Sequence, residues 1–229
     1  MKVPTVANKL PVNWVSMQAT VLASSRYGLE YDRLKVLHEI GLAQPLASDE
    51  SFYVPPVGRA IDTRKVFPDG NITNFAGQRF QDLQDEIARY ADALKAADVA
   101  VMDEMHELLK ATAMLSPVIF KQGTHVLTFE YELALYPNAE QVFELALWAP
   151  MPSFEVSGRA QITATVMLPS SNNFAFNARV LEAVGHQPDA QGNPVTEVPK
   201  VLDSEYGLRH ILVWNWQNDP LFRVKYQYQ

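Results

Sequence analysis

The chain has 229 residues, of which 48% are hydrophobic and 20% charged, so it can bury a core and general disorder is excluded. Its formal net charge is −7 and no basic stripe is present, which argues against binding to nucleic-acid backbones and anionic membranes. The absence of cysteine excludes disulfides, thiolate metal sites and cysteine nucleophiles.

Residues 1–73 are predicted to form an N-terminal arm, a short helix and a long loop. In the arm, apolar residues alternate with more polar ones over residues 15–23, so this segment can pair as a strand. A short helix is expected from Leu29 to Ile40, because its leucines and isoleucine share one helical face and Gly41 follows as a terminator. Prolines and glycines over residues 44–74 predict a long loop or an irregular hairpin.

Residues 74–116 are predicted to form one long helix, at about 75–115. Asn74 is a suitable N-cap, Pro117 is a stop, and apolar residues recur at helical spacing between them. As a helix, the 39 residues from Gln78 to Ser116 would span about 58 Å, longer than a compact fold of this size requires. Its alanine-rich middle is apolar around most of its girth, so we expect a spine covered on several sides. The candidate assembly and packing residues are Leu94, Ala97, Val101 and Met105.

Residues 117–229 are predicted to form an antiparallel β-sheet or sandwich, because the apolar period changes from 3.6 to 2. The candidate strands are Leu127 to Leu135, Phe143 to Leu147, Ala160 to Leu168, Phe174 to Val180, Leu208 to Trp216, and Leu221 to Tyr228. The last two are expected to form a hairpin. The final strand is a possible edge for strand addition, through Phe222, Val224, Tyr226 and Tyr228. The expected fold class is therefore α+β: a long central helix, a C-terminal antiparallel sheet or sandwich, and an extended N-terminal arm.

Titratable residues show no catalytic or metal-binding signature. The five histidines lie in separate segments, and Asp103 with His106 supplies only one copy of a pair that helical di-metal sites need twice. Nucleophile and phosphate-loop motifs are absent. We therefore expect no catalytic residue, no metal and no cofactor, although an enzyme whose site is assembled from scattered residues stays open.

A glycan site is the alternative hypothesis. Glu130 and Glu132 project from one strand face, as the paired carboxylates of some glycosidases do. Aromatic residues that would offer a platform to a sugar ring are Trp148, Trp214, Trp216, Tyr226 and Tyr228. Such residues are more often core and cross-strand pairs. The alternative is thus a carbohydrate-binding or glycan-active β-sandwich protein.

The order of arm, extended loop, long helix and β region resembles that of shell proteins of tailed bacteriophages. The segment Ala93 to Met102 is similar in texture to their spine helices, and the resemblance covers about Phe52 to Leu135. It implies a non-enzymatic structural protein that self-assembles, as a capsid shell, cement or tail part. The implied partners are further copies of the chain and other virion proteins, with no membrane and no sequence-specific nucleic acid. The implied location is the virion, assembled in the host cytoplasm because no secretion signal is visible.

Overall fold

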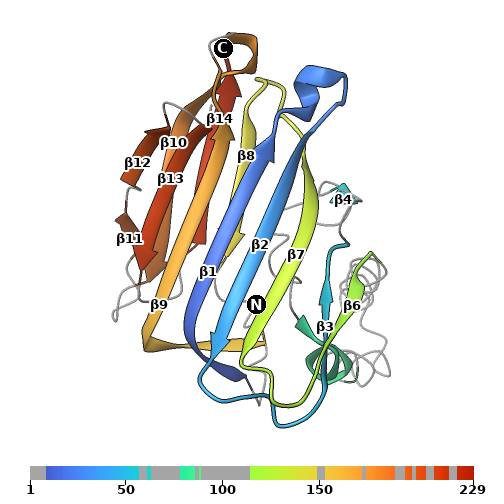
Figure 1. Ribbon diagram of the computed structural model, residues 1–229. Coiled ribbons are helices and arrows are strands. Elements are labelled where there is room, and N and C mark those ends of the chain that lie inside the picture. The colour runs from blue at the N-terminus through green and yellow to red at the C-terminus, as the bar shows by residue number, and fades with distance from the viewer. Residues whose placement is uncertain are drawn as a thin grey trace, which may run out of the picture.

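The computed structural model describes part of the chain, and that part is mostly β-strand. The described residues are 9–56, 61–62, 78–85, 88, 114–148, 153–171, 174–188, 194–197, 200–204, 209–216 and 221–229. Their strands form three sheets, of seven, four and three strands. Figure 1 shows the long strands of the seven-stranded sheet running side by side.

The seven-stranded sheet has the order β12-β13-β9-β1-β2-β7-β4. Its strands are β1 (Leu10–Leu22), β2 (Asp32–Leu42), β4 (Ile61–Asp62), β7 (Val126–Leu135), β9 (Phe154–Pro169), β12 (Lys200–Ser204) and β13 (Arg209–Trp216). β1 pairs antiparallel with β2 and parallel with β9, and β4 pairs parallel with β7. The sheet is therefore mixed, whereas the sequence predicted an antiparallel one.

The four-stranded sheet has the order β11-β10-β14-β8, and the three-stranded sheet has the order β5-β3-β6. Their strands are β3 (Glu50–Val54), β5 (Gln78–Arg79), β6 (Ser116–Phe120), β8 (Phe143–Trp148), β10 (Ala178–Pro188), β11 (Pro194–Glu197) and β14 (Leu221–Tyr228). Two short 3-10 helices, η1 (Ser24–Tyr27) and η3 (Phe174–Phe176), lie in the connections before β2 and β10.

One apolar core joins the seven-stranded and four-stranded sheets as a sandwich. Alternate residues of β1, β7, β9 and β13 point inward from one sheet, and alternate residues of β8 and β14 point inward from the other. Trp214 of β13 packs on Phe222 of β14 across this core, with ring centroids 5.2 Å apart. Full burial of each large apolar side chain contributes about 1.5–3 kcal/mol, so this two-layer core is the main source of stability.

The predicted long helix, and with it the α+β class, is wrong. Within residues 74–116, Gln78–Arg79 form β5 and Ser116 begins β6, while the helical residues described there are 80–85 and 88. No long helix occurs among the described residues. Pairing of β5 and β6 with β3 overrides the local helical period at the ends of this stretch. The four predicted packing residues Leu94, Ala97, Val101 and Met105 lie outside the described residues.

The short helix predicted from Leu29 to Ile40 is also wrong, because residues 32–42 form β2. The inward row of β2 is Leu34, Val36, His38 and Ile40, at a period of two. The strand character of the arm is confirmed, since the alternating apolar residues of β1 face the core. The arm is not free, however, because β1 lies in the middle of the largest sheet between β2 and β9.

The predicted C-terminal hairpin is wrong, although both of its strands exist. β13 pairs with β9 and β12 in one sheet, and β14 pairs with β10 and β8 in the other. Because β14 has a neighbour on each side, the predicted strand-addition edge is wrong too. Its four residues Phe222, Val224, Tyr226 and Tyr228 are buried in the core.

Candidate functional site

A buried carboxylate links the two sheets at the end of the sandwich. Asp32 Oδ1 accepts hydrogen bonds from the backbone N of Ser25 (3.0 Å) and from Ser25 Oγ (2.7 Å). Its Oδ2 accepts from Tyr226 Oη (2.8 Å) and Tyr228 Oη (2.6 Å), which come from the opposite sheet. Burial and the neighbouring Asp32 raise the pKa of both tyrosines. All four bonds serve the packing of η1 and β14 onto β2, so Asp32 is a structural residue.

A second buried polar pair lies within the core face of the large sheet. His38 Nε2 on β2 lies 3.3 Å from Tyr131 Oη on the adjacent strand β7. Burial lowers the pKa of His38 to about 3 and raises the pKa of Tyr131. Both side chains are therefore neutral near pH 7, and this pair satisfies two polar groups inside the core.

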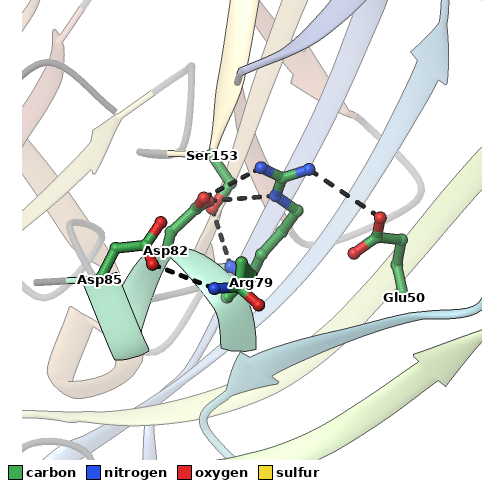
Figure 2. A network of polar contacts seen from close by, with 6 residues as sticks. Glu50, Arg79, Asp82, Asp85 and Ser153 are labelled. Carbon is green, nitrogen blue, oxygen red and sulfur yellow. Dashed lines mark hydrogen bonds and ion pairs between the residues drawn. The ribbon is translucent and has the colours of Figure 1, made fainter. Parts of the chain in front are cut away.

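A third polar cluster fastens residues 78–85 to the sandwich (Figure 2). The buried Arg79 donates to both carboxylate oxygens of Asp82, from Nε (3.1 Å) and from one terminal nitrogen (2.9 Å). Its other terminal nitrogen lies 3.9 Å from Glu50 on β3. The backbone N of Arg79 donates to Ser153 Oγ (2.7 Å), just before β9. This cluster ties three separate segments together.

The residues of the glycan hypothesis come from both sheets of the sandwich, and those whose side chains the structure describes do not share one surface. Glu130 is exposed on the outer face of β7, and Glu132 on the same face pairs with Arg33 and, at 3.5 Å, with Lys35. Trp214 points inward and is buried, as are Tyr226 and Tyr228. Trp148 lies on β8 and Trp216 on β13, and the structure describes their backbone but not their side chains. The structure therefore does not bring Trp214 beside Glu130 and Glu132 on one surface, and the glycan alternative stays a hypothesis.

The outer surface of three neighbouring strands carries no charged side chain over its middle part. We call this set of side chains the uncharged face. Its members are Ile211, Val213 and Asn215 from β13, Gln161, Thr163, Thr165 and Met167 from β9, and Trp14, Ser16, Gln18 and Thr20 from β1. All are exposed or partly exposed. The register places them in rungs that run across the three strands, such as Val213, Thr165 and Gln18.

The neighbouring surfaces are charged, so the uncharged face is local. On the same outer surface, β2 and β7 carry Arg33, Lys35, Glu39, Glu130 and Glu132. The outer surface of the four-stranded sheet carries ion pairs between Arg223 and Glu144 (3.0 Å) and between Lys225 and Glu182 (2.8 Å). Depletion of charge at the centre of a surface is the compositional mark of a protein interface.

Comparison with known protein families and with curated proteins finds no match to this chain. In the part of the chain that the structure describes, no three histidine, aspartate or glutamate residues are grouped so that they could hold a metal ion. Over the same residues, no helix has the length and apolar character needed to span a membrane. The charge pattern of the exterior makes the uncharged face a candidate functional site.

Proposed function

We propose that the protein is a non-enzymatic structural protein that associates with further copies of itself through the uncharged face. The observation that supports this proposal is the charge pattern of the sandwich exterior. The middle of β13, β9 and β1 is uncharged, while the outer surfaces of β2, β7 and the four-stranded sheet are charged. Burial of such a surface in an interface costs little electrostatic free energy, because few charged groups must lose their hydration.

A second copy of the chain is the partner that fits this surface. The chain carries a net charge of −7, so two copies repel each other on average. They repel least where the uncharged faces meet. The face also carries hydroxyl and amide groups, such as Thr163, Thr165 and Gln18, which both donate and accept hydrogen bonds. A surface of this kind is complementary to itself, as a two-fold interface requires.

The size of the face indicates reversible association. From Gln161 to Met167 it extends about 20 Å along the strands, and three strands give it a width of roughly 14 Å. A stable interface buries about 800 Å² per partner, so the uncharged face would form only its centre. The rim would include charged side chains of β2, which is the usual arrangement of a centre depleted in charge and a polar rim.

The charge pattern does not identify the larger structure in which this assembly would take part. A role in a bacteriophage virion stays a hypothesis, which rests on the resemblance stated above. That resemblance depended on an arm, a loop and a long helix in succession. Two of these elements differ in the structure, since the arm is β1 in the middle of a sheet and the described residues contain no long helix.

Cross-linking through a single introduced cysteine tests the proposal, because the chain has no cysteine of its own. Thr165→Cys places one thiol at the centre of the uncharged face, and Arg179→Cys places one on the exposed outer surface of β10 as the matched control. With a short bis-maleimide linker at equal protein concentration, we expect covalent dimers from Thr165→Cys and few from Arg179→Cys.

Equal yields from the two variants would contradict the choice of face. The single substitution Thr165→Glu in the wild-type chain gives the complementary measurement, which is the fraction of dimer in solution. In a two-fold contact this change brings two carboxylates close together, so the dimer fraction should fall. Thr165 is partly exposed, so the substitution should leave the fold intact, which a thermal melt verifies.

A further inference from the structure

A pocket lies at the end of the sandwich, beyond the uncharged face and where β1 and β9 finish. Its volume is about 740 Å³, within the range of small-molecule sites. Its apolar lining includes residues at the strand ends, Leu22 and Pro169. The short helices η1 and η3 supply one wall, through Tyr27 and Phe176.

The charge of this pocket is opposite in sign to that of the whole chain. Arg33 and Arg209 line it, whereas no aspartate or glutamate is among its lining residues. Arg33 is paired with Glu132. Arg209 donates from one terminal nitrogen to the backbone oxygen of Val21 (2.6 Å), and no carboxylate contacts it among the described residues. Its guanidinium is a planar donor whose remaining N–H groups match a carboxylate or phosphate group.

The aromatic wall adds a second recognition element. The rings of Tyr27 and Phe176 are 5.3 Å apart at their centroids, with planes inclined by 42°. Tyr27 is 79% exposed, which is unusual for a large aromatic side chain and leaves its ring open to a ligand. The hydroxyl-bearing residues Ser24, Ser170 and Ser171 also line the pocket and can bond to a polar ligand group.

We propose that this pocket binds a small organic anion in which a flat aromatic ring carries a phosphate or carboxylate group. Arg209 holds the oxyanion, and the Tyr27–Phe176 pair contacts the ring. Leu22 and Pro169 supply apolar lining of the same pocket. The inference is independent of the proposed self-association, because none of these residues belongs to the uncharged face.

Calorimetric titration of the wild-type protein with phenyl phosphate, benzoate and inorganic phosphate tests the site. Stacking on the aromatic pair should make phenyl phosphate bind roughly tenfold more tightly than inorganic phosphate. Comparison of phenyl phosphate with benzoate shows which oxyanion the pocket prefers, and tighter binding of either than of inorganic phosphate supports the proposal.

Two variants separate the two recognition elements. Arg209→Gln should weaken the binding of phenyl phosphate roughly tenfold or more, because it removes a charge-assisted hydrogen bond. Arg179→Gln, on the exposed surface of β10, is the matched control and should leave the Kd unchanged. Tyr27→Ala should weaken the binding of phenyl phosphate and leave the binding of inorganic phosphate unchanged.

The proposal is overturned if neither aromatic anion binds the wild-type protein, or if Arg179→Gln and Arg209→Gln weaken binding equally. Arg209→Gln also removes the bond to Val21, so a thermal melt must accompany it. Should that variant fail to fold, Tyr27→Ala decides the question, because its side chain is largely exposed. An unchanged preference for phenyl phosphate over inorganic phosphate in Tyr27→Ala would then overturn the proposal.

Discussion

At the scale of single residues, the buried His38 links the stability of the protein to pH. Burial lowers its pKa from 6.5 to about 3 in the folded protein. Below pH 6.5 the unfolded chain binds a proton at this histidine and the folded protein does not. The free energy of unfolding therefore falls as the pH drops from 6.5 toward 3. Between pH 7 and pH 5, this one residue accounts for a loss of about 2 kcal/mol.

Denaturant unfolding of wild type and His38→Gln at pH 7 and pH 5 measures this effect. The glutamine amide would keep a hydrogen-bonding group near Tyr131 but would not titrate, so the variant should lose less stability on acidification. His125→Gln is the control, because His125 is exposed and should not change the difference. A His38→Gln variant with the same pH dependence as wild type would show that His38 is not buried in neutral form.

A close contact between Trp14 and Gly41 predicts how a substitution at Gly41 affects stability. A Cβ atom at Gly41 would lie 2.0 Å from Trp14 Nε1 and 2.3 Å from Cε2, so the indole covers the glycine on the outer surface of β1 and β2. Gly41→Ala must displace the indole ring, so we expect the free energy of unfolding to fall by about 1–3 kcal/mol.

The double-mutant cycle supplies the control for this contact. In a Trp14→Ala background the space above residue 41 is open, so Gly41→Ala should cost much less. Denaturant midpoints of the four proteins give the coupling energy. The contact has no energetic role if Gly41→Ala costs the same in both backgrounds.

At the scale of elements, the parallel pairing of β1 with β9 defines the topology of the large sheet. Ser16 and Thr163 are partners in this register. Neighbouring strands lie about 4.8 Å apart, within the Cα separation that a disulfide accepts. Under mild oxidation at low protein concentration, Ser16→Cys with Thr163→Cys should form an intramolecular disulfide.

The control for this disulfide uses the hairpin that the sequence predicted. Val213 and Lys225 would lie near each other across that hairpin, but in the structure they belong to different sheets and face away from each other. Val213→Cys with Lys225→Cys should therefore stay reduced as a monomer. Mass spectrometry after thiol alkylation distinguishes the two outcomes, and the opposite pattern would refute the topology.

Some elements could be predicted from sequence because one face of a strand is buried and the other is solvated. The ranges predicted for β7, β8 and β13 agree closely with the structure for this reason, as does that for β14. In β2 the same signal failed, because a histidine occupies the inward row and Leu37 the outward row. The hairpin failed because alternation within a strand carries no information about which sheet the strand joins.

The uncharged face could be read only in part from the sequence. Alternation in β9 already places Thr163 and Thr165 opposite the core, whereas residues 211–214 of β13 are all apolar and do not reveal which row faces inward. The pairing of β1 with β9 depends on long-range contacts, since β1 comes from the beginning of the chain. No local sequence pattern encodes such contacts. The segment 74–116 shows the same limit, since β5 and β6 form through pairing with the distant strand β3.

At the scale of the whole molecule, an acidic chain with one uncharged sheet face should associate through that face. The sandwich supplies a rigid support, because β1 and β9 lie in the middle of seven hydrogen-bonded strands. Rigid elements position a contact surface with little ordering cost on binding. The buried Asp32 joins β2 of this sheet to η1 and to β14 of the opposite sheet.

Sedimentation velocity over a range of protein concentrations tests this central claim most directly. The wild-type protein should show a reversible shift from monomer to dimer or larger species as concentration rises. Thr165→Glu should stay monomeric over the same range, while Arg179→Glu, on the outer surface of β10, should behave like wild type. A wild-type protein that sediments as a single compact monomer at every concentration would contradict the account.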